Sequence, residues 1–293
     1  RQHTHAMSHK GFTSHVSTVA LGLGDNIVCV VSAGNNTRDV LIATSDTVFV
    51  QDRTGALTRR IHWDTDGKES TSRFSEITCI APYGNSIIVV SSLDHAIWMI
   101  TAANKLVVLL GNEDDSGSIN GHPRLSRFNL PNTILVDEPN GVFFVSDTRN
   151  NCIRRVCVDR DPEKSIVSTI CTIERPRSMA WLSQTNNNFV VTGSDSCLHK
   201  IDITESGVAV VSTISLVDRE GRSMGVPVSV AVDGAGSIIV VFENKHHIAC
   251  FKYVEGARAY MVRIIAGWFV CLSVCWFVCL VCCLFGVLSV WCV

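Results

Sequence analysis

The feature that most constrains this chain is a β-hairpin pattern that occurs five times along it. The clearest copy, VFFVSDTRNNCIRRVCV at residues 142–158, is an apolar run, a polar turn and a second run in which apolar and basic residues alternate. In every copy a short β-branched run leads through a polar turn into a second apolar run, as expected for two antiparallel strands. The second runs open at intervals of 45 to 56 residues, at Val48, Ile97, Ile153, Leu198 and Ile248.

Two further apolar runs flank each hairpin. The preceding runs are IVCVV, ITCIA, TILVD, SMAWL and VSVAV, and the following runs are LTRRI, KLVVLL, SIVSTI, GVAVVSTI and AYMVRII. Each unit therefore predicts four short strands, and four strands repeating at this period are typical of a β-propeller. Because one four-stranded sheet cannot bury both of its faces alone, we expect neighbouring blades to stack. The predicted fold class is all-β, with five visible blades.

The third unit, residues 111–158, closely resembles the NHL repeat. The matching positions are Gly111, Gly117 and Gly121, the pair Arg127–Phe128, Pro131, the step from Val145 to Thr148, Asn150 and the pair Ile153–Arg154. The other four units are degenerate copies, and the resemblance spans roughly residues 27–267. It implies a propeller of NHL-like blades, a family in which six blades are common. We therefore expect a sixth blade in the intact protein, to which residues 16–21 contribute a lone outer strand.

The polar turn of the third unit supplies the candidate binding residues, which are Asp147, Arg149, Asn150, Arg154 and Arg155. Asp147 and Asn150 flank the turn, where their side chains can bond to backbone N–H groups. Arg154 and Arg155 fall on opposite faces of a strand, because successive side chains alternate. Two interpretations stay open: these residues cap the turn and cover a solvated strand, or they contact a ligand at the rim of the propeller.

Charge and cysteine usage narrow the possible partners and compartments. The net charge of −2 over 293 residues gives no general attraction to nucleic acid or acidic lipid. Of the thirteen cysteines, seven are spread singly through the body of the chain, mostly inside apolar runs. No disulfide framework is visible, which indicates a reducing compartment. The expected location is the cytoplasm, or a membrane if the C-terminal tail is an anchor.

Three segments are expected: a polar, disordered stretch at 1–15, the propeller at 16–267, and an apolar, cysteine-rich tail at 268–293. The chain begins at Arg1, as a fragment or a processed product would. The tail is uncharged and long enough to span a bilayer. It also consists almost wholly of Val, Cys, Leu, Phe, Trp and Gly, which codons of only G and T can encode. A transmembrane anchor and a gene-model artefact both explain this composition.

The body of the chain contains no sequence motif for nucleophilic catalysis, phosphate binding or metal coordination, so no catalytic residue, metal ligand or cofactor is predicted. We expect a non-catalytic scaffold that binds a protein partner through loop 111–127 and turn 147–151. The alternative is a propeller enzyme, lyase- or lactonase-like and metal-assisted, with its site in the central channel. RNA binding on one propeller face is a third hypothesis, implied by the resemblance; its nearest candidates are Arg149, Arg154, Arg155, Arg175 and Arg177.

Overall fold

Each recurring unit forms one four-stranded antiparallel sheet in the computed structural model of the chain. The sheets are numbered blades 1 to 5 in chain order. The structure describes residues 6–9, 12–15, 27–33, 39–52, 54, 56–59, 62–63, 69–70, 74–113, 115–159, 164–183, 187–218, 220–243, 247–254 and 259–267.

Every blade is a meander in which each strand pairs with the next one along the chain. Blade 1 consists of β3 (Ile27–Ser32), β4 (Val40–Thr44), β5 (Val48–Gln51) and β6 (Leu57–Arg59). Blade 2 consists of β9 (Ile77–Tyr83), β10 (Ser86–Ser91), β11 (Ala96–Ile100) and β12 (Leu106–Gly111). Blade 3 consists of β13 (Pro131–Asp137), β14 (Val142–Asp147), β15 (Cys152–Cys157) and β16 (Ile166–Thr172), with the short 3-10 helix η1 (Thr148–Asn150) between β14 and β15.

The last two described blades have the same order. Blade 4 consists of β17 (Met179–Ser183), β18 (Asn188–Thr192), β19 (Cys197–Ile203) and β20 (Ala209–Ser215). Blade 5 consists of β21 (Pro227–Val232), β22 (Ile238–Phe242), β23 (His247–Val254) and β24 (Ala259–Gly267). All five predicted sets of four strands are thereby confirmed, and the runs predicted to open at Val48, Ile97, Ile153, Leu198 and Ile248 are the third strands of the blades.

Burial decreases from the second strand of a blade to its outer strand. β10 and β14 are buried along almost their whole length, whereas β20 is mostly exposed. Because the neighbouring blades cover both faces of β10 and β14, these strands read as unbroken apolar runs rather than as alternating ones. Aromatic rings fill the space between blades: the ring centroids of Phe144 in blade 3 and Phe189 in blade 4 are 4.8 Å apart.

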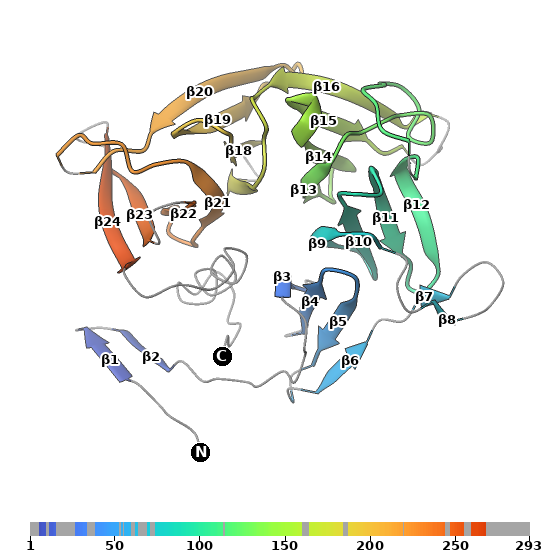
Figure 1. Cartoon of the computed structure of the whole chain (residues 1–293), viewed down its shortest axis with the longest axis horizontal. Coiled ribbons are helices and arrows are strands. Elements are labelled where there is room, and N and C mark those ends of the chain that lie inside the picture. Colours follow the sequence, from blue (N-terminus) through green and yellow to red (C-terminus); the bar gives the residue numbers. More distant parts are fainter. Residues whose placement is uncertain are drawn as a thin grey trace.

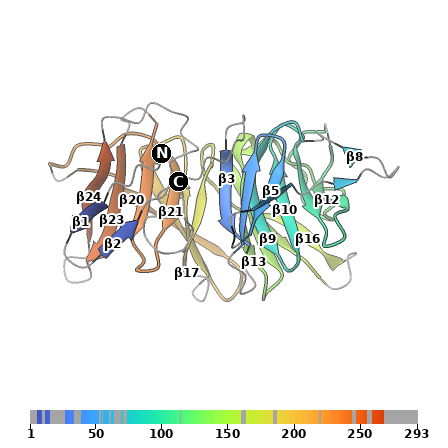
Figure 2. The same cartoon turned by 90° about the horizontal axis from the view of Figure 1, so that it is seen from below.

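The blades stand around a central axis, with the first strand of each blade innermost (Figure 1). The inner strands pack on one another in the order β3, β9, β13, β17 and β21, and Figure 2 shows them from the side, running along the axis. The ribbon of blade 5 does not adjoin that of blade 1, so the ring of the five described blades is open on that side (Figure 1). This architecture confirms the all-β propeller.

Two short hairpins lie outside the blades. β1 (Ala6–His9) pairs with β2 (Phe12–His15) in the polar N-terminal stretch, and β7 (His62–Trp63) pairs with β8 (Glu69–Ser70) between blades 1 and 2. No helix in the described part of the chain is long and apolar enough to cross a membrane. The predicted lone strand at 16–21 and the tail at 268–293 lie outside the described residues.

Candidate functional site

The inner strands of all five blades surround a central cavity of about 910 Å³. Its wall is mostly apolar and includes the side chains of Val28, Ile80, Ile134, Met179 and Val230. Small-molecule sites in proteins typically occupy about 300–1,000 Å³, with apolar walls and a few polar groups that fix the orientation of the ligand. The propeller axis therefore offers a hollow with the size and lining of a small-molecule site.

A charged pair lies at one end of this cavity and bridges blades 4 and 5. Arg177 precedes β17 and Glu243 follows β22, and both residues line the cavity. The Nη1 atom of Arg177 is 3.6 Å from Oε1 of Glu243, and the side chains are 36% and 44% exposed. An ion pair this exposed contributes little to stability, about 0–1 kcal/mol. Either group can therefore exchange its partner for a ligand at small cost.

Backbone hydrogen bonds hold both charged residues in position. The N–H of Arg177 donates to the carbonyl oxygen of Thr192 at 2.9 Å, and the carbonyl oxygen of Arg177 accepts a bond from the Ser146 hydroxyl at 2.8 Å. The N–H of Glu243 donates to the carbonyl oxygen of Val226 at 3.0 Å. Only the side chains need to move when a ligand binds, which favours a pre-organised site.

Hydroxyl groups on the inner strands connect the blades around the cavity. The Thr78 hydroxyl of blade 2 donates to the carbonyl oxygen of Asn132 in blade 3 at 2.8 Å. The Ser178 hydroxyl of blade 4 accepts the N–H of Val230 in blade 5 at 3.1 Å and lies 3.3 Å from the Ser229 hydroxyl. Thr78, Ser178 and Ser229 also line the cavity, so they add hydrogen-bonding groups to its apolar wall.

The described residues contain no group of three or more His, Cys, Asp or Glu side chains that could hold a metal ion. The metal-assisted form of the enzyme hypothesis thus finds no ligand set in this part of the chain.

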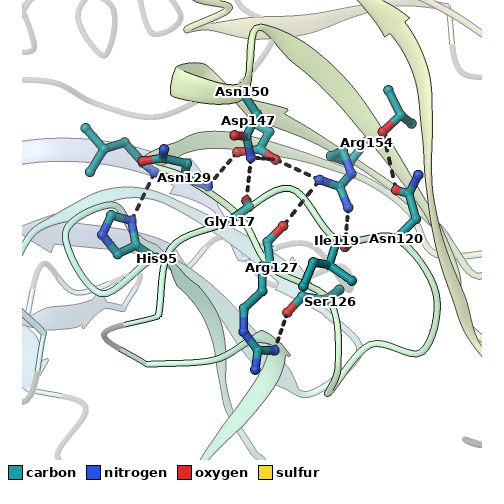
Figure 3. A network of polar contacts seen from close by, with 12 residues as sticks. His95, Gly117, Ile119, Asn120, Ser126, Arg127, Asn129, Asp147, Asn150 and Arg154 are labelled. Carbon is teal, nitrogen blue, oxygen red and sulfur yellow. Dashed lines mark hydrogen bonds and ion pairs between the residues drawn. The ribbon is translucent and has the colours of Figure 1, made fainter.

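The predicted binding residues Asp147, Asn150 and Arg154 meet one another in blade 3 (Figure 3). The Asp147 carboxylate accepts bonds from the Asn129 N–H at 2.8 Å, the Asn150 side-chain amide at 2.8 Å and the Arg154 guanidinium at 2.9 Å. The side chains of Asp147 and Arg154 are both fully buried. The network therefore contains a buried ion pair, and its contacts are within the protein.

This network secures the loop that leads into blade 3. The Arg154 guanidinium donates to the carbonyl oxygens of Ile119 at 2.6 Å and Arg127 at 3.3 Å, and the Asn150 amide donates to that of Gly117 at 2.6 Å (Figure 3). The guanidinium also stacks over the Phe128 ring at 5.0 Å. These side chains therefore bond to the loop before blade 3, and the Asp147 side chain makes no capping hydrogen bond to η1.

Burial dominates the electrostatics of this network. It raises the pKa of the Asp147 carboxyl above the ordinary value of 3.8, and the bonds from Asn129, Asn150 and Arg154 oppose that rise without cancelling it. The buried carboxylate is therefore less favourable than one in water, and the bonds from Asn129, Asn150 and Arg154 together favour its ionised form.

The remaining predicted residues do not join this network through their side chains. Arg149 is exposed on η1, and its backbone N–H donates to the carbonyl oxygen of Asn129 at 3.0 Å. Arg155 is half-buried on the strand face opposite Arg154, as predicted, and lies close to Gly207 of blade 4. A ligand-binding role for these residues stays a prediction.

The five arginines considered for RNA binding differ in their surroundings. Arg149 and Arg175 are exposed, Arg155 is half-buried, Arg154 is fully buried, and Arg177 is paired with Glu243. The RNA hypothesis therefore stays a prediction that rests on the exposed members of the set.

Sequence reasoning did not identify Glu243 and considered Arg177 only as an RNA contact. A signal for Glu243 was present, because it directly follows the second strand of blade 5, as Asp147 ends the second strand of blade 3. Its pairing with Arg177, 66 residues earlier in the chain, depends on the angle between two blades and has no local signature.

Known proteins resemble this chain in fold but not in sequence. No family model matches the chain, and no curated protein matches it in sequence. Among solved structures, it is similar to virginiamycin B lyase from Staphylococcus aureus, with a TM-score of 0.54 and 13% identity over 82% of this chain and 69% of that one. It is also similar to a gluconolactonase from Xanthomonas campestris, with a TM-score of 0.59 and 12% identity over 88% and 84%.

A third similar structure is that of the nidogen/laminin complex, with a TM-score of 0.62 and 10% identity over 87% of both chains. What is shared is the propeller fold. At such low identity the similarity extends no further, and the neighbours include both enzymes and a protein complex. The NHL resemblance is not confirmed, since no family model matches.

Proposed function

We propose that this protein is an enzyme that acts on a small molecule in its central cavity, in the manner of a lyase or a lactonase. The observation that carries the proposal is the Arg177–Glu243 pair, which adds an acid–base group and a cation to an otherwise mostly apolar cavity of about 910 Å³. The fold similarity to virginiamycin B lyase and to a gluconolactonase supports this proposal over the scaffold hypothesis.

The proposed roles follow from the chemistry of the two groups. Opening a cyclic ester, by water or by elimination, requires a base to remove a proton and a donor to stabilise the negative charge that develops on oxygen. Glu243 is the proposed base, because its carboxylate reaches the cavity and is partly exposed to solvent. Arg177 is the proposed oxyanion donor, since its guanidinium presents several N–H groups and stays charged.

The experiment compares turnover of a panel of lactones and cyclic esters by the wild-type protein and by Glu243→Gln and Arg177→Gln. We expect each substitution to lower kcat/KM by about 10²–10⁴-fold, the usual range for an acid–base group. Arg222→Gln is the matched control, because Arg222 forms an exposed ion pair with Glu220 and does not line the cavity. Turnover that is unchanged in Glu243→Gln would overturn the assignment.

A protein-binding scaffold is the second candidate, supported by the exposed apolar residues of blade 4. Val208, Val210 and Val211 are 59%, 51% and 39% exposed on or beside the outer strand β20. Contiguous exposed apolar side chains are typical of interaction surfaces. The similarity to the nidogen/laminin structure is compatible with this role. Copurification of one defined partner with the wild-type protein, and its loss with Val210→Lys, would support it.

We also propose that blade 3 is of the NHL type. The residues that carry the resemblance, Asp147, Asn150 and Arg154, contact one another and hold the loop that opens the unit. Gly111 fits the same interpretation, because its φ of +84° suits glycine and an added Cβ would lie 2.8 Å from the His95 carbonyl oxygen. Sequences of related chains that vary freely at these positions would contradict the proposal.

A further inference from the structure

Two thiols from neighbouring blades meet in the wall of the central cavity. Cys29 lies on β3 of blade 1 and Cys79 on β9 of blade 2, and both line the cavity. Their Sγ atoms lie 4.0 Å and 3.7 Å from one acceptor, the carbonyl oxygen of Ile80. Both thiols therefore point toward the same carbonyl group. Two cysteines that are 50 residues apart in the sequence thus form a dithiol at the surface of a cavity.

The surroundings of this dithiol favour one kind of ligand. Cys29 is half-buried and Cys79 is buried, and the neighbouring wall consists of Val28, Val31 and Ala81. An apolar wall of this kind disfavours strongly hydrated ions, because they would have to give up their water. Soft metal ions bind thiolates strongly and lose water readily, and Cu(I) is the common example.

We propose that Cys29 and Cys79 form a two-coordinate site for Cu(I). Binding forms two Cu–S bonds and releases one proton from each thiol, with no change in oxidation state. The bound group carries one net negative charge. The site uses neither residue of the proposed acid–base pair as a ligand, so it does not depend on the proposed enzymatic function.

A second pair of cysteines lies away from the central cavity. Cys152 and Cys171 lie on neighbouring strands of blade 3 and influence each other electrostatically. Neither lines the central cavity, and burial raises the pKa of each. Because this pair does not line the cavity, it serves as the internal control for the cavity pair.

The test is residue-resolved alkylation of the full chain, read by peptide mass spectrometry. Thiols are labelled with N-ethylmaleimide under argon, with and without Cu(I) buffered by a chelator. Reading each peptide separately distinguishes Cys29 and Cys79 from the six cysteines of the tail. We expect Cu(I) to slow the labelling of Cys29 and Cys79 together, by about tenfold or more, because the metal-bound sulfur is no longer nucleophilic.

Variants show whether the two thiols act as one site. In Cys29→Ser we expect the protection of Cys79 by Cu(I) to disappear, whereas in the matched control Cys157→Ser, whose cysteine does not line the cavity, it should remain. Circular dichroism confirms that each variant keeps its β-structure; if Cys29→Ser does not fold, the wild-type comparison alone decides. The proposal is overturned if Cu(I) leaves both labelling rates unchanged, if Cys79 stays protected in folded Cys29→Ser, or if a disulfide already blocks both thiols before metal is added.

Discussion

Arg154 has the largest fully buried side chain in the described part of the chain, and partners inside the protein compensate its charge. It pairs with the equally buried Asp147 at 2.9 Å and donates to two carbonyl oxygens of the loop before blade 3. A buried ion pair of this kind adds little net stability over apolar residues of the same volume, but removing one partner leaves an uncompensated charge. We therefore expect the pair to favour one conformation of the loop, and to contribute little to the free energy of unfolding compared with an apolar pair.

Arg154→Met is expected to destabilise the protein by about 3–5 kcal/mol, because it strands the Asp147 carboxylate and two loop carbonyl groups. Urea unfolding measures this loss. Arg149→Met, at an exposed position two residues beyond Asp147, should change the free energy of unfolding by under about 0.5 kcal/mol. A loss of less than about 1 kcal/mol in Arg154→Met would show that the network does not hold the loop.

The thiols of Cys152 and Cys171 should alkylate slowly in the folded protein. Their pKa values are raised from 9.0 to about 11 and about 12, mainly by burial. At pH 8 the thiolate fraction, and with it the labelling rate, should be about 100-fold lower for Cys152 than in the unfolded chain. Both folded pKa values exceed the unfolded value, so these groups add stability below pH 9 that is lost as the pH rises toward 11.

That pH dependence is measured by labelling folded and urea-unfolded protein from pH 7 to 10, with each cysteine followed by mass spectrometry. The folded-state rate of Cys152 should still rise about tenfold per pH unit at pH 10, where the unfolded rate levels off. Equal rates in both states at pH 8 would contradict the burial of these thiols.

At the scale of secondary structure, the outer strands determine how the molecule meets its surroundings. β20 is seven residues long, carries no charge or proline, and pairs only with β19 among the described strands. Edge strands usually carry features that prevent pairing with other chains, such as lysine, proline or a bulge. The regular pairing of β20 with β19 contains no register shift, so this edge lacks such protection.

We expect the wild-type protein to self-associate through the β20 edge as its concentration rises, and Val210→Lys to reduce this, because a charge on an exposed edge disfavours strand addition. Sedimentation velocity at several protein concentrations measures the effect. The free energy of unfolding should change by less than about 0.5 kcal/mol, since Val210 is 51% exposed. Arg222→Lys, which keeps the charge in an exposed loop, is the control and should associate as the wild type does. Self-association that persists in Val210→Lys would exclude β20 as the contact.

At the scale of the whole molecule, hydrogen bonds between inner strands join blades that share no sheet. Ser178 provides one such link between blades 4 and 5, since its hydroxyl accepts the Val230 N–H. Ser178→Ala should destabilise the protein by about 1–3 kcal/mol, because that buried N–H loses its acceptor. Hydrogen exchange should show faster exchange at Val230 than in Ser206→Ala, an exposed control. Unchanged exchange at Val230 would show that apolar packing alone aligns the two blades.

The blade pattern was predictable because its determinants are local. A β-branched run, a polar turn and a second run specify a hairpin through neighbouring residues, and the same is true of all four strands in each unit. Asp147 and Asn150 were identifiable as polar turn residues from their position after an apolar run, but their bonds to Asn129 and Gly117 were not, because these partners lie 18 and 33 residues away. The role of Arg154 was not, because its carbonyl partners at Ile119 and Arg127 lie in a loop whose path no short-range rule describes.

The sequence by itself determined that this chain is a series of four-stranded sheets, that five are visible and where their strands lie, but it did not indicate the short hairpins β1–β2 and β7–β8 outside the blades. Only the tertiary structure decided that Arg177 faces Glu243, that Cys29 meets Cys79, and that a cavity lies between them. The physical reason is that strand and turn preferences act over a few residues, whereas these contacts depend on the angles at which separate blades pack. Those angles result from the sum of many apolar contacts between blades, and no single stretch of sequence encodes them.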